Sequence, residues 1–269
     1  MSQFSLRFLG VGNAQAVALG ASCAVLELSG QPSLMIDCGA DSLAAYVDAY
    51  GDLPSALYIT HPHLDHISGL EGLFYRLATS PWSQPRRPRI YCPVSILQVL
   101  QRRLADYPNI LAEGGSNFWD VFQLIPVSEQ FWHERLLFAV FPVRHHEHLS
   151  AFGLALPGRF LYTGDTRPIP EVLTRYACHG EQIFHDCATT RSPSHTSIED
   201  IAIEYQPEQW RRMVFYHYES AEAGRRIEEL GYRTARRGDC FDLSAPAASR
   251  GDSEPWSSDA VEPPLRAAC

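Results

Sequence analysis

Three histidines and an aspartate stand within six residues, from His61 to His66, in a stretch that reads YITHPHLDHISGLEG. An apolar run, residues 56–59, leads directly into this cluster, and a helix-like Ile-Ser-Gly-Leu follows it. The pattern predicts a strand, a polar turn and the start of a helix. Ordinary surface polar groups would not require such flanks, so we expect the cluster to form a site at the end of a rigid strand.

The second half of the chain repeats this arrangement of strand and polar turn. Four apolar segments run into His or Asp: RLLFAVFPVRHHEH, RFLYTGDTR, QIFHDCATT and MVFYHYES. Earlier strands are predicted at SLRFLGV, CAVLEL, SLMIDCG, ALYIT and RIYCP, with helices at residues 41–54, from the histidine cluster to about residue 80, and at 94–107, 198–205 and 220–230. Ligand-type residues therefore follow strands, where the loops of layered α/β folds converge.

Length and composition predict one folded unit with a tail. The chain has 269 residues, of which 45% are hydrophobic and 20% charged, enough for one large domain with a substantial core. From Ser244 onward the sequence is rich in Ser, Ala, Pro and acids and has almost no core-forming residues. We expect a single domain over residues 1–243 and a disordered tail over 244–269.

Charge, hydropathy and cysteine usage restrict the binding partners and the cellular location that we expect. A formal charge of −9 argues against a broad basic surface for long nucleic acid, although a local basic groove stays compatible with it, and favours a small-molecule or nucleotide-type substrate. No stretch approaches the roughly twenty apolar residues of a membrane span, and no signal peptide is evident, so a cytoplasmic protein without a membrane partner is expected. Seven scattered cysteines without a Cys-x-x-Cys pair fit reduced thiols. The sequence leaves a homodimer open.

The spacing His61-x-His63-x-Asp65-His66 resembles the pattern of the metallo-β-lactamase superfamily. The similarity continues through FLGVG, MIDCG, a downstream histidine cluster, YTGDT, HDCATTRSPSHTS and VFYHY, in the order that this superfamily uses. The resemblance implies an α/β fold of the αββα sandwich type, with two β-sheets face to face and helices outside. It also implies a two-metal hydrolytic site along one edge of the sandwich.

The residue types suit such a site independently of the resemblance. Imidazole nitrogen and carboxylate oxygen bind Zn(II), Mn(II) or Fe(II). The two-metal site that the resemblance implies would hold two divalent ions, with zinc as the first candidate. If the strand geometry continues through the turn, His61 and His63 share one metal while Asp65 and His66 face the second. The resemblance further implies that Asp165 bridges the metals, that His217 completes the second metal and that Asp37 orients a ligand histidine.

The third histidine of the first metal must come from PVRHHEHLS. Leu137, Ala139, Phe141 and Val143 form an apolar alternate row that we expect to face the core, and His145 continues this row. A one-residue bulge would substitute His146, and His148 is a weaker alternative.

Several other polar and aromatic residues have simpler interpretations. His185 and Asp186, each taken alone, are expected to be turn or capping residues at a strand end. The basic run at residues 86–89 is expected to be a solvated loop, with a phosphate-binding patch as the alternative. Five aromatic residues are expected in the core or in a pocket wall: Phe118, Trp119, Phe122, Phe131 and Trp132.

The resemblance implies that hydroxide activated by two metals is the nucleophile, with Asp65 and His195 as the catalytic side chains. His195 precedes Ser197, a predicted N-cap for a helix that begins at Ile198, so a capped helix end would hold its imidazole in place. We expect His195 to protonate the leaving group and not to bind metal, because histidine titrates near neutrality.

Two stretches favour phosphodiester chemistry. HPHLDHISGL resembles the signature of class II cyclic-nucleotide phosphodiesterases, from which Glu71 and Gly72 depart, and HDCATTRSPSHTS resembles a stretch of the tRNA 3′-processing endonucleases. A phosphodiesterase acting on a nucleotide or a nucleic-acid end is the expected function. The alternatives are an acyl hydrolase of a thioester, lactone or β-lactam, and a non-hydrolytic di-iron or binding protein.

Overall fold

The computed structural model describes residues 3–78, 87–105 and 117–243. The predicted tail, residues 244–269, and the first residue of the basic run at 86–89 lie outside the described residues. No helix within the described ranges is long and apolar enough to span a bilayer.

Two mixed β-sheets form the centre of the molecule, in the strand orders β13-β1-β2-β3-β4-β5-β6 and β12-β11-β10-β9-β8-β7. The first sheet contains β1 (Phe4–Gly10), β2 (Cys23–Leu28), β3 (Gln31–Ile36), β4 (Ala56–Tyr58), β5 (Arg89–Pro93), β6 (Gln123–Val127) and β13 (Cys240–Asp242). The second contains β7 (Gln130–His133), β8 (Leu136–Pro142), β9 (Phe152–Leu156), β10 (Phe160–Tyr162), β11 (Gln182–Asp186) and β12 (Met213–Tyr216). Neighbours from β3 to β6 and from β10 to β12 are parallel, so their carboxyl ends share an edge.

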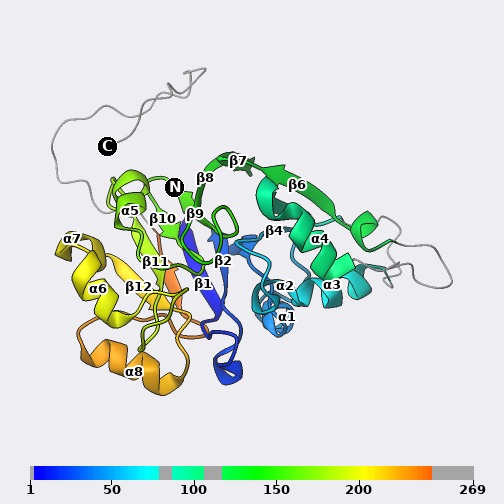
Figure 1. Cartoon of the computed structure of the whole chain (residues 1–269). Helices are drawn as coiled ribbons and strands as arrows, with labels where there is room; N and C mark the ends of the chain where they lie inside the picture. Colours follow the sequence, from blue (N-terminus) through cyan, green and yellow to red (C-terminus); the bar gives the residue numbers. More distant parts are fainter. Residues whose placement is uncertain (1–2, 79–86, 106–116, 244–269) are drawn as a thin grey trace.

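Helices cover the outer face of each sheet. Figure 1 shows α1, α3 and α4 on one side of the paired sheets and α5 to α8 on the other. The α-helices are α1 (Ser42–Tyr50), α2 (Leu64–Ile67), α3 (Gly69–Ala78), α4 (Leu97–Ala105), α5 (Pro170–Tyr176), α6 (Ile198–Glu204), α7 (Pro207–Trp210) and α8 (Ala221–Glu229). Short 3₁₀ turns are η1 (Val17–Leu19), η2 (Val94–Ile96) and η3 (Phe118–Val121). The expected αββα sandwich is confirmed.

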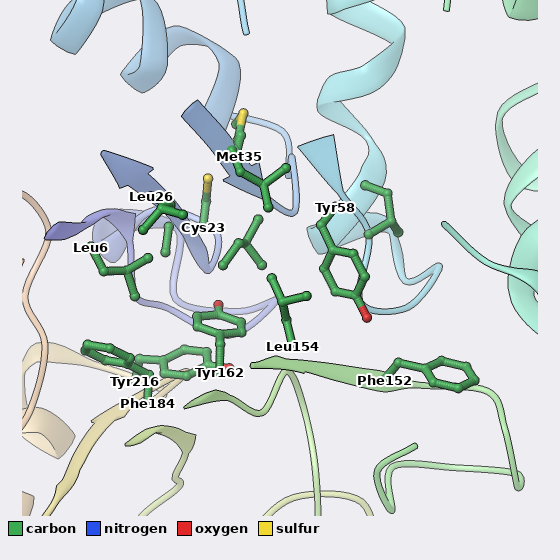
Figure 2. Close-up of a cluster of buried hydrophobic side chains, with 14 of the residues drawn as sticks. Leu6, Cys23, Leu26, Met35, Tyr58, Phe152, Leu154, Tyr162, Phe184 and Tyr216 are labelled. Atoms are coloured by element: carbon green, nitrogen blue, oxygen red, sulfur yellow. The ribbon is translucent and has the colours of Figure 1, made fainter. Parts of the chain in front are cut away.

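Aromatic side chains join the two sheets. Phe8 of β1 lies 5.4 Å from Phe184 of β11 and 5.6 Å from Tyr216 of β12, measured between ring centroids. Figure 2 shows side chains of both sheets, among them Leu26 and Leu154, gathered in one cluster. Burying a large apolar side chain contributes about 1.5–3 kcal/mol to the free energy of unfolding. This interface holds the ends of strands from both sheets at one edge of the sandwich.

Local sequence signals placed most helices correctly. The sequence spacing predicts one apolar row of Ile96, Leu97, Leu100 and Leu104. Ile96 of η2 and Leu100 and Leu104 of α4 are buried, whereas Leu97 is half-buried. Ser197 caps α6 by accepting a hydrogen bond from the amide of Asp200, which confirms the predicted helix start. The expectation for Trp132 is wrong, because its side chain is 65% exposed. β7 is an edge strand whose alternation turns Phe131 inward and Trp132 outward.

Two glycines let the histidine-bearing segment dock on the end of β3. The amide of Cys38 donates to the carbonyl of His66 at 2.7 Å, and the amide of Gly69 donates to the carbonyl of Cys38 at 2.9 Å. A Cβ at Gly69 would lie 2.3 Å from the carbonyl oxygen of Gly39, and a Cβ at Gly39 would lie 2.1 Å from that of Asp65. The backbones approach so closely that neither position can accept a side chain without displacing α2.

Gly69→Ala is therefore expected to lower the free energy of unfolding by about 1–3 kcal/mol, the usual cost of overpacking. Gly72→Ala is the matched control in the same helix, because its Cβ would meet only Leu43 Cδ2 at 3.5 Å, an ordinary contact. That control should be neutral or stabilising by up to about 1 kcal/mol. Urea unfolding of both variants measures the difference, and equal stabilities would contradict the close-approach argument.

Candidate metal centre

The structure brings together all seven residues predicted as metal ligands. They lie in two groups whose ligand atoms are within 4.8 Å of one another: His61, His63, His145 and Asp165 in the first, and Asp65, His66 and His217 in the second. Each follows the carboxyl end of a strand: β4 and α2 supply the first histidine cluster, β8 precedes His145, β10 precedes Asp165 and β12 precedes His217. Residues far apart in the sequence thus meet at one edge of the sandwich.

The carboxylate of Asp165 lies at the centre of these groups. Its Oδ2 atom is 3.6 Å from His61 Nε2 and 3.8 Å from His145 Nε2. The same oxygen is 3.4 Å from His66 Nε2 and 3.2 Å from His217 Nε2. Two ligands of a tetrahedral zinc, each at about 2.0–2.1 Å, are about 3.4 Å apart. Asp165 is therefore placed where one carboxylate can contact ions in both groups.

His145, and not His146, belongs to the first group. Its Nε2 lies 3.3 Å from His63 Nδ1, while its Nδ1 donates to the carbonyl of Ser194 at 2.9 Å. The carbonyl fixes the ring so that Nε2 faces the site. Neither His146 nor His148 belongs to a ligand group among the described residues.

Asp37 fixes the orientation of the His66 ring through a hydrogen bond to its Nδ1 atom. Its Oδ2 accepts from His66 Nδ1 at 2.8 Å and from the Thr60 hydroxyl at 2.7 Å, and its Oδ1 accepts from the Thr60 amide at 2.8 Å. The carboxylate is fully buried, and its residue has a φ of 61°, in the left-handed region that is uncommon for side chains with a Cβ. These bonds hold the lone pair of His66 Nε2 toward the second group.

Asp186 plays the same part for His195 and also lies beside His217, and the sequence interpretation as a strand-end turn residue missed this. Its Oδ2 accepts from His195 Nδ1 at 2.8 Å, and its Oδ1 lies 3.4 Å from His217 Nδ1. The missed signal was its place after β11, next to the strands that carry Asp165 and His217. His185 matches the simpler interpretation, because its ring bonds to the Tyr205 hydroxyl and the backbone of Asp186.

His195 stands at the margin of both groups. Its ring centroid is 4.8 Å from that of His145 and 5.0 Å from that of His217, and its side chain is 24% exposed. A ring nitrogen of His195 also lies within 4.8 Å of ligand atoms of Asp165 and His217, so these three could hold an ion as well. The geometry therefore places His195 within reach of a substrate bound at the site.

Unpaired buried atoms support a cation at this position. Among the described residues, His61 Nε2, His66 Nε2, His217 Nε2 and Asp165 Oδ1 are buried and have no hydrogen-bond partner. Leaving such atoms unsatisfied costs about 1–3 kcal/mol each. The three imidazole nitrogens lie 3.2–3.6 Å from Oδ2 of the same Asp165 carboxylate, and this donor set is one that a divalent transition metal satisfies. The two groups are therefore able to bind metal.

The electrostatics of the two groups differ. Burial and the neighbouring His145 lower the pKa of His63 to about 4, and burial and His66 hold the pKa of His61 well below its usual range. Burial also lowers the pKa of His217, but Asp165 and Asp186 outweigh this effect and raise that pKa to about 10. The first group thus offers neutral imidazoles, whereas an ion at the second would release a proton from His217.

A cleft opens beside the first group. It has a volume of about 580 Å³, and His61, His63 and His145 form part of its lining. Binding sites for small molecules commonly measure about 300–1,000 Å³. The cleft therefore connects the candidate metal centre with a space large enough for one nucleotide-sized molecule.

Asp37→Asn is expected to weaken zinc binding by about 10- to 100-fold, the usual effect of removing a group that orients a ligand histidine. An amide at this position would present an N–H to one of its three donors and favour the His66 tautomer whose Nε2 carries the proton. Calorimetric titration against a competing chelator measures the affinity. Asp48→Asn, an exposed change on α1, is the control. Unchanged affinity in Asp37→Asn would contradict the assigned hydrogen-bond network.

Solved structures share this fold. A diphosphatase of the PhnP family superposes with a TM-score of 0.70 at 18% identity, covering 90% of this chain and 98% of that one. The metallo-β-lactamase fold protein YhfI from Bacillus subtilis gives 0.66 at 13% identity, covering 90% and 100%. The short form of human tRNase Z gives 0.60 at 18% identity, covering 89% and 99%. The chain therefore has the metallo-β-lactamase fold.

Sequence comparison identifies the family, within this fold, to which the chain is similar. The Anti-Pycsar protein Apyc1 from Bacillus phage BSP38 is 25% identical over 258 residues, covering 86% of this chain and 93% of the relative. The protein of the same name from Paenibacillus harenae is 29% identical over 190 residues, covering 68% and 76%. The family description "Anti-Pycsar protein Apyc1" matches residues 4–241. Because this match includes nearly all of the described sandwich, the chain belongs to the Anti-Pycsar protein Apyc1 family.

Proposed function

We propose that the protein is a metal-dependent phosphodiesterase that hydrolyses a nucleotide-type substrate. The observation that carries the proposal is the His195–Asp186 pair beside the two metal-binding groups. An alkoxide that leaves a phosphodiester needs a proton, and a histidine held by a carboxylate is a suitable donor. Two proteins with the same fold, named as a diphosphatase and a tRNase, agree with phosphate chemistry.

Two ions, zinc in the first place, would be held by the two groups. We assign His61, His63 and His145 to one ion, and Asp65, His66 and His217 to the other, with Asp165 between them. Two divalent ions supply a water of lowered pKa and offset negative charge on the reacting phosphate. The protein contributes rigid placement, because each ligand follows the end of a strand.

His195 donates the proton to the leaving oxygen in this proposal. Its Nδ1 is engaged with Asp186, so Nε2 is the nitrogen that can face the substrate. Its partial exposure allows the ring to regain a proton from water after each turnover. Asp65, whose side chain is 17% exposed, is more open than the other carboxylates of the site and can accept a hydrogen bond from the attacking water.

The shape and charge of the protein favour a small substrate. The cleft of about 580 Å³ is suited to a single nucleotide and not to a duplex. The formal charge of −9 opposes the binding of long nucleic acid. A cyclic mononucleotide, in which the phosphodiester lies inside one nucleotide, matches these limits and the signature of residues 61–70.

The purified, zinc-loaded protein is expected to hydrolyse bis(p-nitrophenyl) phosphate and nucleoside 3′,5′-cyclic phosphates with higher kcat/KM than p-nitrophenyl acetate. Elemental analysis of the same sample should give two ions per chain, because two complete groups are present. Protein stripped of metal is the control for background ester hydrolysis. Thousandfold faster metal-dependent acyl hydrolysis would establish the acyl hydrolase alternative instead, and one ion per chain would refute the two-ion assignment.

His195→Ala is expected to lower kcat on a cyclic nucleotide by about 10²- to 10⁴-fold, the usual contribution of a positioned acid. The loss should be much smaller for bis(p-nitrophenyl) phosphate, because p-nitrophenolate leaves without a proton. His179→Ala is the control, because this side chain is 70% exposed and belongs to no ligand group among the described residues. Equal losses on both substrates, or loss of an ion from His195→Ala, would assign His195 to substrate positioning or metal binding.

A further inference from the structure

Two segments form the sides of the cleft beside the first metal group. Residues of η2 and α4, including Val99 and Arg103, form one side, and the loop after β8, including Glu147 and Leu149, forms the other. The hydroxyl of Ser95 donates to the carbonyl of Leu149 at 2.7 Å and joins the two sides. Leu149 has a φ of 60°, so this bond holds an unusual backbone conformation in the loop. The cleft is therefore built from anchored segments.

One charge from each side faces this space without a protein partner. Within the part of the chain that the structure describes, neither the Arg103 guanidinium nor the Glu147 carboxylate makes a hydrogen bond or ion pair. Arg102, the neighbour of Arg103 on the same helix, does not line the cleft. A guanidinium only donates hydrogen bonds, and an ionised carboxylate only accepts them. A ligand that satisfies both must present acceptors to one side and donors to the other.

Apolar side chains complete the cleft. Val99 and Leu149 both line the cleft, and each is 40% exposed. A planar ring bound against these side chains would remove apolar surface from water. The lining therefore suits a flat, hydrogen-bonding group better than a flexible charged chain.

We propose that this cleft binds the base of the substrate nucleotide and prefers guanine, with Arg103 and Glu147 as the residues that determine specificity. Guanine has two adjacent acceptors, O6 and N7, and two adjacent donors, N1–H and the N2 amino group. Adenine carries an amino donor in place of O6, which would face the guanidinium. The inference rests on the proposed function, because a phosphate bound at the metal groups would place the base in the adjoining cleft.

The test compares kinetic constants for guanosine and adenosine 3′,5′-cyclic phosphates. The unmodified protein should show a lower KM for the guanosine substrate. Arg103→Ala and Glu147→Gln should each raise that KM by about 10- to 100-fold, the discrimination typical of one bidentate contact to a base, with little change in kcat. Arg103→Lys, which keeps the charge but loses the paired donors, should fall between these values.

Two controls separate base recognition from general effects. Arg102→Ala should leave all constants unchanged, and every variant should hydrolyse bis(p-nitrophenyl) phosphate, which has no base, within about twofold of the unmodified protein. Equal KM values for the two cyclic nucleotides, or equal losses on both in Arg103→Ala, would overturn the proposal. An Arg102→Ala variant whose KM rises as much as that of Arg103→Ala would also overturn the proposal.

A binding measurement distinguishes failure of this inference from failure of the proposed function. Calorimetric titration with guanosine and adenosine 5′-monophosphates reports base recognition without any turnover. Tighter binding of the guanosine nucleotide that depends on Arg103 would support the base site even if no phosphodiester were hydrolysed, in which case the proposed function would be wrong. Hydrolysis of phosphodiesters with equal binding of both nucleotides would leave the proposed function standing and refute the base site.

Discussion

A buried carboxylate surrounded by four imidazoles is the interaction on which the rest of this structure depends. Asp165 is 1% exposed, and its Oδ2 lies 3.2–3.8 Å from one nitrogen each of His61, His66, His145 and His217. Burying a charge is costly unless it is paired. The loops after β4, β8, β10 and β12 must therefore converge within a few ångströms, and the interface between the two sheets supplies the rigidity for this.

This convergence requires an unfavourable backbone conformation at two residues of the site. Asp37 and His217 both have positive φ values, of 61° and 66°. Conformations of this kind cost about 1–3 kcal/mol each and persist only where the surroundings enforce them. The amide of Asp37 donates to the Tyr58 carbonyl at 2.9 Å, and that of His217 to the Val11 carbonyl at 2.7 Å. Hydrogen bonds to neighbouring segments thus hold both residues in left-handed backbone conformations that their side chains disfavour.

Sequence periodicity predicted the strands that carry the site. The alternation of side chains along β8, continued past its end, selected His145. The expectation that the row continued by His145 faces the core is wrong for Leu137 and Ala139, which are half-buried, whereas Phe138 and Val140 of the other row are buried. Phe141 is fully buried, but its ring lies 4.9 Å from that of Tyr176 of α5, so the row meets the helix layer and not the opposite sheet. For Asp186 and Trp132, the sequence interpretation failed because neither the neighbours of β11 nor the edge position of β7 is encoded locally.

By itself, the sequence determined which residue types follow which strands, because an apolar run that ends in His or Asp has a short-range signature. The αββα class was implied by the resemblance that these segments, in their order, bear to the metallo-β-lactamase superfamily. Only the tertiary structure decided that the Asp186 carboxylate bonds to His195 and lies 3.4 Å from His217 Nδ1, and that Arg103 and Glu147 line one cleft. The physical reason is that hydrogen bonds and clefts depend on distances between segments that are remote along the chain, and sheet order and packing set those distances.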